Sequence, residues 1–496
     1  MNTRRDFLKA AGAGAAALAA GQPFATPRGR QADSPNVLII TTDDMNWDSA
    51  GAFGNPIPNI TPHIDRLAEE GMRFERAHVT TPVCVPAREA MFSGTWPHKN
   101  GSNAGFFALR PEITTLHEQM KAAGYFIGQV GKEHLNPGGS FPKDYRAGPQ
   151  KDLRRGRFPG RYRTYTEECL EAAHASGRPF FVHVGIMDPH RPFAGRDHLG
   201  PEGEGALRGG NGPPAPFSRK IRPEEVPLPP YADLIEGDAR AVLADYYTSV
   251  HRADESVGAV MAAFRQSEYE KENTVVIFIT DHGWLMADRG KLTLYPDGTR
   301  SALIVRWPGV ATEGAVDREH FINLMDLTPT VIDISGAPES PDVAAEATSF
   351  RPLLEGASQD GRERVFTELN GGYGDAPMRF FQPERAVQDA RRLYYFRPHL
   401  YDGAGTRIHD DDNQAPGDEQ VEELYDLTRD PHAAGSNLAG DPEHRRELRA
   451  YRARLLEHLR RTNDPAARAL ARVDSREALA QFMAEQRQLV KTKSQQ

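Results

Sequence analysis

Ionisable side chains follow four short apolar runs of this sequence, at the points where the runs end. The runs cover residues 36–41, 125–130, 180–186 and 275–280. The side chains that follow them are Asp43 and Asp44, Lys132 and His134, Asp188 and His190, and Asp281 and His282. The carboxyl ends of parallel strands meet at one edge of a sheet, where ligands bind in open α/β folds. We therefore expect these side chains to form one site.

Three carboxylates in this set indicate a metal site. Asp43, Asp44 and Asp281 would repel one another at close range unless a cation lay between them. Carboxylate oxygens are hard ligands and favour Ca²⁺ or Mg²⁺ over soft metals. His282 follows Asp281 directly, so it can ligate or support the ion. A single aspartate at a strand end is often only a helix cap, and the prediction therefore depends on the three together.

Basic groups accompany the carboxylates. They are Lys132, His134, His190 and Lys291. Cationic donors stabilise negative oxygens on a transferred group, and an imidazole can protonate the leaving atom. Each of these residues alone could be a structural histidine or a solvated lysine, but together they predict chemistry on a negatively charged group.

A cysteine lies in the segment TPVCVPAR, at residues 81–88. Pro86 suits the first turn of a helix, which places Cys84 at a helix N-terminus, where backbone N–H groups favour an anion. Arg88 is one turn further on and can reach back toward Cys84. These residues predict an activated cysteine beside the metal site, and an inert buried cysteine is the alternative.

The four apolar runs are typical of strands that are covered on both faces. Helices are expected from Thr61 to Gly71, from Thr115 to Gly124, over residues 242–264 and from Thr328 to Gly336. Alternating strands and helices predict an α/β fold with a large, mostly parallel sheet between two layers of helices. Residues 195–230 are rich in Gly and Pro and are predicted to form a long loop.

The pattern changes after about residue 355. A hairpin is indicated by residues 385–388 and 392–396, a further strand by 423–427, and a helix by 441–461. We predict a catalytic domain over residues 33–355 and a smaller α+β domain with an antiparallel sheet over residues 356–465. Residues 466–496 are predicted to be a charged tail that is either helical or frayed.

The N-terminus predicts export. Arg4 and Arg5 precede a short apolar, alanine-rich stretch, so residues 1–32 are assigned to a twin-arginine signal and a linker. We expect a periplasmic or secreted protein that the twin-arginine translocase exports in the folded state. The net charge of −9 argues against a nucleic-acid partner. Cys84 and Cys169 are the only cysteines, so there is no disulfide framework, and one bridge between them is the alternative.

With these residues in view, the sequence resembles the formylglycine-dependent sulfatases of the alkaline-phosphatase-like superfamily. Residues 84–88 match the C-x-P-x-R signature at which maturation enzymes oxidise the cysteine. The pair Asp43-Asp44, GKEH at residues 131–134 and TDHG at residues 280–283 match the accompanying motifs. The resemblance runs from about Asn36 into the C-terminal domain.

The resemblance implies a role for each residue. A formylglycine-generating enzyme in the cytoplasm would convert Cys84 to formylglycine, whose hydrate would attack the sulfur of a sulfated saccharide. The implied ligands of one Ca²⁺ ion are Asp43, Asp44, Asp281, His282 and the modified residue 84. The implied catalytic groups are Arg88 and Lys132, which polarise the nucleophile; His190, which protonates the leaving atom; His134, which accepts a proton during sulfate release; and Lys291, which binds a sulfate oxygen.

Four segments resemble heparan N-sulfatases, which hydrolyse N-sulfoglucosamine: residues 130–137, 188–191, 290–295 and 423–432. This chain has His282 and Lys291 where that group has asparagine and arginine. Hydrolysis of a sulfamate and hydrolysis of an O-sulfate on heparan or an algal polysaccharide both remain open. Two further alternatives are a phosphoryl or phosphonate monoester hydrolase of the same superfamily and a non-catalytic glycan-binding relative.

Overall fold

The computed structural model describes residues 34–102, 107–137, 141–148, 157–194, 217–286, 289–338, 340, 343, 346–357, 360–370, 383–398 and 421–494. The predicted signal over residues 1–32 lies outside these ranges, as does most of the predicted loop over residues 195–230. The domain boundaries proposed from the sequence stay predictions.

The four apolar runs form the centre of the large sheet. They are the strands β1 (Asn36–Asp43), β3 (Phe126–Gly131), β5 (Phe180–Pro189) and β6 (Thr274–Thr280), which run parallel in the order β3-β5-β1-β6. The sheet has five further strands: β4 (Tyr145–Ala147), β7 (Arg300–Arg306), β2 (Met72–His78), β8 (Val316–Asp317) and β9 (Ile322–Asn323). Only the pairings of β7 with β6 and with β2 are antiparallel, so the sheet is mostly parallel, as predicted.

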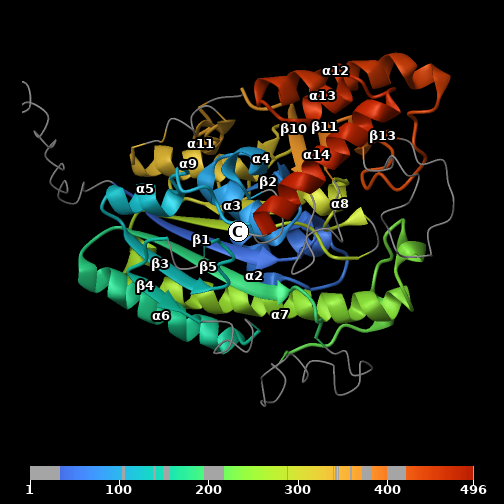
Figure 1. Cartoon of the computed structure of the whole chain (residues 1–496). Coiled ribbons are helices and arrows are strands. Elements are labelled where there is room, and N and C mark those ends of the chain that lie inside the picture. Colours follow the sequence, from blue (N-terminus) through green and yellow to red (C-terminus); the bar gives the residue numbers. More distant parts are fainter. Residues whose placement is uncertain are drawn as a thin grey trace, which may run out of the picture. The chain divides into compact units, whose positions relative to one another are not determined.

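Helices cover both faces of this sheet (Figure 1). Along β1, Leu38 and Ile40 pack on one side, while Val37 and Ile39 pack on the other. The first side is covered by α2 (Pro62–Glu69), α6 (Pro159–Ser176) and α7 (Ala239–Gln266). The second side is covered by α3 (Cys84–Ser93), α5 (Leu116–Ala122) and α9 (Leu327–Ser335). The apolar alternation of one buried strand therefore supplies both hydrophobic layers.

Two helix starts differ from the sequence prediction. The Thr61 hydroxyl does not cap α2, because it donates to Asp65 and accepts from the backbone N–H of Gly51. The helix α9 begins at Leu327 rather than after Thr328, whose hydroxyl donates to the carbonyl of Met91. Tertiary hydrogen bonds thus replace the local caps that the sequence suggested.

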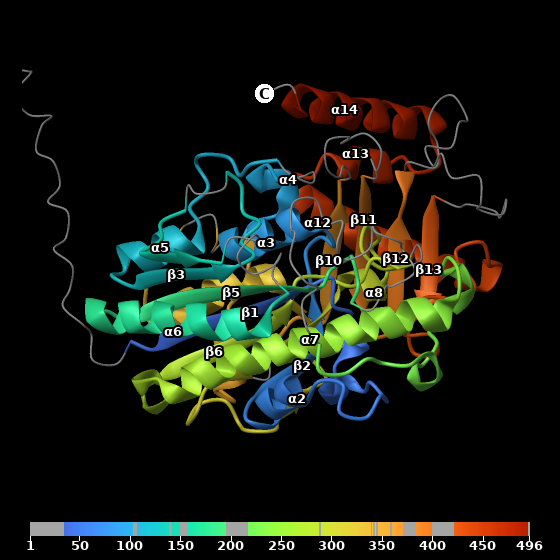
Figure 2. The same ribbon diagram turned by 90° about the horizontal axis from the view of Figure 1, so that it is seen from below.

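A second sheet is antiparallel and consists of β10 (Arg364–Leu369), β11 (Glu384–Asp389), β12 (Arg392–Phe396) and β13 (Glu422–Asp426). One face packs against α12 (Arg445–Arg461), α13 (Ala466–Leu470) and α14 (Arg476–Ser494) (Figure 2). Leu479, Phe482 and Met483 of α14 are buried in this core, so the predicted tail contributes to packing. The other face packs against Val83 and against Leu294 and Tyr295, which belong to loops at the edge of the large sheet.

His98 joins α4 (Pro97–Asn100) to the second sheet. Its Nδ1 lies 2.5 Å from Glu368 of β10 and 3.6 Å from Asp464, and its Nε2 lies 3.2 Å from the carbonyl of Thr462. Burial by itself would lower the pKa of His98, but the neighbouring Glu368 and Asp464 outweigh burial and raise it. The imidazolium form is therefore favoured in the folded protein.

The raised pKa of His98 predicts that the protein loses stability as the pH rises. A group whose pKa is raised on folding stabilises fully below its unfolded pKa, about 6.5 for histidine, and this contribution disappears as the pH passes the folded value. In urea titrations from about pH 6 to about pH 8, the free energy of unfolding should fall for the wild type and fall less for His98→Gln. The matched control is His444→Gln, which removes a surface partner of Glu447. Equal slopes for wild type and His98→Gln would contradict the assignment.

Candidate active site

Cys84 is the first residue of α3, and Val83 precedes it with an extended backbone. The predicted position at a helix N-terminus is thus confirmed. Both Cys84 and Cys169 are buried and free, so the two cysteines form no bridge. Only 2% of the surface of Cys84 is exposed, which places its sulfur inside the protein.

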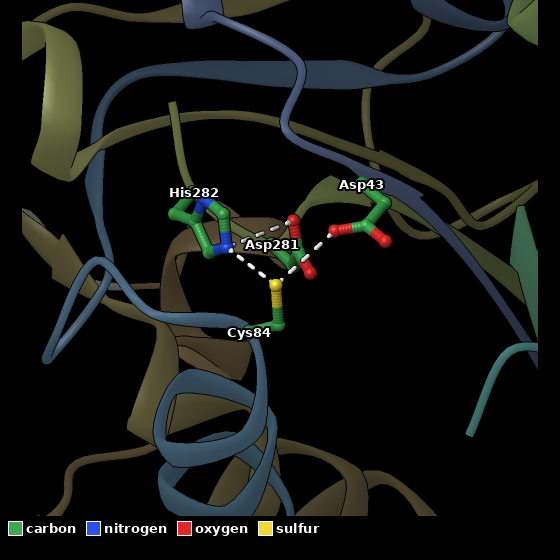
Figure 3. Close-up of side chains that lie close together, drawn as sticks. All are labelled: Asp43, Cys84, Asp281 and His282. Atoms are coloured by element: carbon green, nitrogen blue, oxygen red, sulfur yellow. Dashed lines mark hydrogen bonds and ion pairs between the residues drawn. The ribbon is translucent and has the colours of Figure 1, made fainter. Parts of the chain in front are cut away.

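The predicted metal ligands surround this sulfur. Its distances are 3.5 Å to Asp43 Oδ1, 4.0 Å to Asp44 Oδ1 and 3.2 Å to His282 Nε2. Asp281 lies beside them, 3.8 Å from His282 Nε2 and 3.2 Å from the backbone nitrogen of Asp44 (Figure 3). One potential ligand atom from each of Asp43, Cys84, Asp281 and His282 lies within 4.8 Å of the others. The strand ends therefore converge as the sequence suggested.

Each carboxylate is paired with a buried cation. Lys291 Nζ lies 2.7 Å from Asp44 Oδ1 and 3.0 Å from the sulfur of Cys84. Lys132 forms an ion pair with Asp43, and Arg88 Nε lies 3.0 Å from Asp281 Oδ2. Each of the three carboxylates thus faces one basic side chain, and burial holds the pKa of Lys132 well below its usual range.

Asp44 and Asp281 are ionised in this arrangement. Burial alone would raise the pKa of each, but nearby basic groups outweigh burial and both values are lowered. Lys291 contributes most for Asp44; His282 and Arg88 contribute most for Asp281, and of these two only Arg88 keeps its charge when the imidazole is neutral. Ionised carboxylates are the form that binds a metal.

The thiol of Cys84 is not activated, contrary to the sequence prediction. Burial raises its pKa to about 12, Asp44 and Asp281 act in the same direction, and the opposing effect of Lys291 does not offset burial. The unmodified residue is thus a neutral thiol at physiological pH. A helix N-terminus and one lysine do not compensate for desolvation next to two carboxylates.

Two histidines have assignable tautomers. His282 Nδ1 lies 2.9 Å from the carbonyl of Gly283, and His190 Nδ1 lies 2.6 Å from the carbonyl of Arg191. A carbonyl only accepts, so Nδ1 carries the proton in both residues. The Nε2 lone pair of His282 then faces Cys84 and can ligate a metal. His190 Nε2 lies 3.9 Å from Asp44 Oδ2, on a side chain that is 24% exposed.

Burial lowers the pKa of His282 and of His190, to about 3 for His190, so both imidazoles are neutral. His134 follows β3 with a φ of 47°, a conformation that is uncommon outside glycine. Burial, then Lys132 and Arg88, hold the pKa of His134 well below its usual range. The site thus contains neutral imidazoles among fixed cations.

Asp188 does not join the other carboxylates. Its oxygens accept from Arg157 Nη1 at 2.8 Å and from Arg252 Nε and Nη2 at 2.7 and 3.1 Å. Arg157 also donates to the carbonyl of His190, at 2.7 Å. Sequence reasoning missed both arginines, because Arg252 lies within the apolar pattern of α7 and no motif includes Arg157. Asp188 thus fixes the strand end that carries His190.

Comparisons with known proteins agree with this geometry. The family model described as Sulfatase matches residues 35–337, and a model of the twin-arginine translocation signal sequence matches residues 1–21. The signal indicates export through that pathway to the periplasm or beyond, as predicted. In the part of the chain that the structure describes, we find no helix with the length and apolar character of a membrane span.

Three relatives illustrate the similarity. Human N-sulphoglucosamine sulphohydrolase is 28% identical over 87% of this chain and 91% of its own length. A protein solved in complex with its substrate, D-glucosamine-2-N,6-O-disulfate, is 18% identical, with a TM-score of 0.65 over 87% of this chain and 98% of that one. The phosphonate monoester hydrolase of Agrobacterium radiobacter is 19% identical, with a TM-score of 0.64 over 86% and 96%. These two structures show the shared fold.

Replacing Asp188 by asparagine should strongly destabilise the protein, because two buried guanidinium groups would lose their counter-charge. We expect the free energy of unfolding to fall by about 3–5 kcal/mol in urea titrations. The matched control is Asp333→Asn, which breaks a partly exposed pair with Arg351 and should cost less than about 1 kcal/mol. Similar effects of the two substitutions would show that the buried pairs do not stabilise this strand end.

Proposed function

Because the chain belongs to the sulfatase family, we propose that it hydrolyses the sulfate groups of a sulfated glycan at the site around Cys84. Members of this family hydrolyse sulfuric esters, and the chain is an enzyme of this class. The observation that carries the proposal is the position of the Cys84 sulfur, within 4.0 Å of Asp43, Asp44, His282 and Lys291. This position supports a site in which the proposed nucleophile, metal ligands and sulfate-binding cation are in contact.

We propose that Asp43, Asp44, Asp281 and His282 bind one Ca²⁺ ion. Sulfatases are known for the use of a metal and of formylglycine. The residues fit a hard cation, because Asp43 and Cys84 lie within 4.8 Å of ligand atoms of Asp281 and His282 on one side and of Asp44 and His190 on the other. In addition, Asp44 Oδ2 is buried with no hydrogen-bond partner among the described residues. When bound, the ion would supply Lewis-acid polarisation of the nucleophile.

We also propose that a formylglycine-generating enzyme modifies Cys84 in the cytoplasm. When formed, the hydrated aldehyde supplies one hydroxyl as nucleophile and a second from which sulfate is released. The raised pKa of the Cys84 thiol supports this assignment, because a neutral thiol is a poor nucleophile. Since the folded chain buries Cys84, the modifying enzyme needs to reach it before the fold is complete.

The cations would hold the sulfate group. With the carboxylates committed to a metal, the ammonium groups of Lys132 and Lys291 become available to sulfate oxygens. Arg88 keeps its Nε on Asp281, while its Nη2 is buried without a hydrogen-bond partner among the described residues. These donors are positioned before the substrate arrives and can stabilise charge that develops on the sulfate oxygens.

His190 is the proposed acid and His134 the proposed base. His190 is neutral without substrate, and the negative charge of a bound sulfate would raise its pKa toward the protonated form that an acid requires. Its partly exposed side chain lies where a leaving sugar can reach it. His134 is neutral and can accept a proton, as a base must.

The relatives favour sulfated glucosamine as the substrate class. One hydrolyses N-sulphoglucosamine, according to its name, and another binds a glucosamine that carries both an N- and an O-sulfate. We propose a heparan-type glucosamine sulfate as the substrate. His282 and Lys291 leave N-sulfate and O-sulfate as competing positions for the assay to distinguish.

The proposed reaction and its nucleophile can be tested by assays on the purified enzyme and on a Cys84 variant. The purified enzyme should hydrolyse an aryl sulfate faster than the corresponding aryl phosphate, and it should release sulfate from N-sulfoglucosamine or from an O-sulfated glucosamine. Cys84→Ala should lose at least about 1,000-fold in kcat because the nucleophile is removed. In the active enzyme, mass spectrometry should find residue 84 lighter than cysteine by the exchange of SH and H for an aldehyde oxygen.

Cys169→Ala is the matched control, since Cys169 is the other buried, free cysteine and lies outside the site. It should retain activity. A free thiol at residue 84 in fully active enzyme would rule out the modification. Faster cleavage of the phosphate would favour a phosphoryl or phosphonate hydrolase, and glycan binding without turnover would favour a non-catalytic relative.

The proposed Ca²⁺ site can be tested by removing the ion. Removing the ion with a chelator should abolish sulfate release, and added Ca²⁺ should restore it, because the carboxylates need a cation to orient the nucleophile. Elemental analysis should find about one Ca²⁺ per active chain, as expected for one carboxylate cluster. Asp281→Asn removes a negative charge and should lose the ion, whereas His282→Asn replaces a neutral nitrogen ligand by a neutral amide oxygen and should retain it. Full activity of metal-free protein would exclude the proposed role.

A further inference from the structure

A chain of buried polar side chains crosses the large sheet beneath the site. Thr41 of β1, His183 of β5 and Gln129 of β3 lie on neighbouring parallel strands, on the face that α3 covers. Thr41 Oγ1 lies 3.0 Å from His183 Nε2, and His183 Nδ1 lies 2.9 Å from Gln129 Oε1. All three residues are buried next to the apolar side chains of this layer. Polar groups in such a layer are costly unless every one is satisfied.

Both ends of this Thr41–His183–Gln129 chain reach proposed catalytic residues. At one end, Arg88 Nη1 donates to Thr41 Oγ1 at 3.2 Å. At the other end, Gln129 Nε2 donates to the carbonyl of Lys132 at 3.3 Å and to that of Val130 at 3.3 Å. The chain thus links a guanidinium on α3 to the loop that carries Lys132.

The two ends give every hydrogen bond one direction. The carbonyls of Val130 and Lys132 only accept, so the amide nitrogen of Gln129 faces them and its Oε1 faces His183. An amide oxygen also only accepts, so His183 Nδ1 carries a proton. In a neutral imidazole Nε2 is then unprotonated and accepts from the Thr41 hydroxyl, whose oxygen accepts from Arg88. The reverse tautomer would turn the amide oxygen of Gln129 toward these carbonyls.

The surroundings of His183 keep the imidazole neutral. Its ring lies 5.0 Å from that of Phe92, and the ionisable groups that act on it are Arg88, His117 and Asp281. Burial, then Arg88 and His117, hold the pKa of His183 well below its usual range, against the opposite effect of Asp281. A neutral imidazole with one fixed tautomer can accept on one side and donate on the other.

The chain also defines what Arg88 presents to a ligand. Asp281 holds Nε and Thr41 holds Nη1, while Nη2 is buried and has no hydrogen-bond partner in the described part of the chain. Two contacts on different nitrogens fix the plane of a guanidinium group. The direction in which Arg88 Nη2 points is therefore fixed before a ligand binds.

We propose that Thr41, His183 and Gln129 are positioning residues that orient the Arg88 guanidinium and the Lys132 loop for sulfate, with His183 held as the Nδ1–H tautomer. The roles of Arg88 and Lys132 in this inference rest on the proposed function. The tautomer does not depend on it, because it follows from the hydrogen bonds of Gln129 and from the burial of the imidazole.

The first test compares three threonine variants in sulfate hydrolysis. Thr41→Val keeps the shape but removes the hydroxyl, and its kcat should fall by up to about 100-fold, the cost of misplacing a catalytic group by about 1 Å. Thr41→Ser restores the hydroxyl and should recover most of this loss. Thr42→Val removes a buried hydroxyl from the next position of β1. Among the described residues this hydroxyl bonds to Met45 Sδ, outside the Thr41–His183–Gln129 chain, so the variant should keep the wild-type kcat. Thermal midpoints of all variants separate lost activity from lost folding.

The second test measures the tautomer in the wild-type enzyme. Long-range proton–nitrogen NMR correlation of ¹⁵N-histidine-labelled protein, with His183 assigned by its absence in His183→Phe, should show a neutral ring protonated on Nδ1. An Nε2–H tautomer or an imidazolium would overturn the proposal, as would a wild-type kcat in Thr41→Val. If the wild type releases no sulfate, the proposed function fails. The NMR result still decides whether the hydrogen bonds of Thr41, His183 and Gln129 have the proposed direction.

Discussion

Three carboxylates and three cations, buried together at one edge of the large sheet, are the interaction on which the site depends. Asp43, Asp44 and Asp281 are each paired with a cation, and Cys84 lies among them. Burial of ions is costly, so the pairs are stable only with short distances and satisfied donors. These ion pairs join the carboxyl ends of β1, β3 and β6 to α3 and to the loop that carries Lys291.

The surrounding structure holds these elements in place. Lys132 donates its backbone N–H to Gly185 at 2.8 Å, and a Cβ at Gly185 would overlap the carbonyl of Lys132, so only glycine allows this approach. The second sheet packs on Val83 and Leu294, next to Cys84 and close to Lys291. Residues that are far from the site in the sequence thus control the distances between its side chains.

The thiol illustrates how position and environment can have opposite effects. A helix N-terminus and Lys291 favour a thiolate, yet burial beside Asp44 and Asp281 raises the pKa of Cys84 to about 12. A cluster of ionised carboxylates disfavours another anion at its centre. The same cluster is compatible with a neutral residue that becomes a nucleophile only after modification and metal binding.

Local patterns were enough to predict the four central strands, the helix that begins at Cys84 and the aspartates at the strand ends, because apolar runs, a proline in a first turn and strand termini are properties of short segments. They were not enough for β2, whose sequence MRFERAH lacks a strand pattern and which forms through its pairing with β7. Nor could they show that Asp188 is held by two arginines, that Cys84 is a neutral thiol, or that His183 joins Thr41 to Gln129. Those outcomes depend on which distant groups share a buried space and on how far water is excluded from it, and only the tertiary structure determines both.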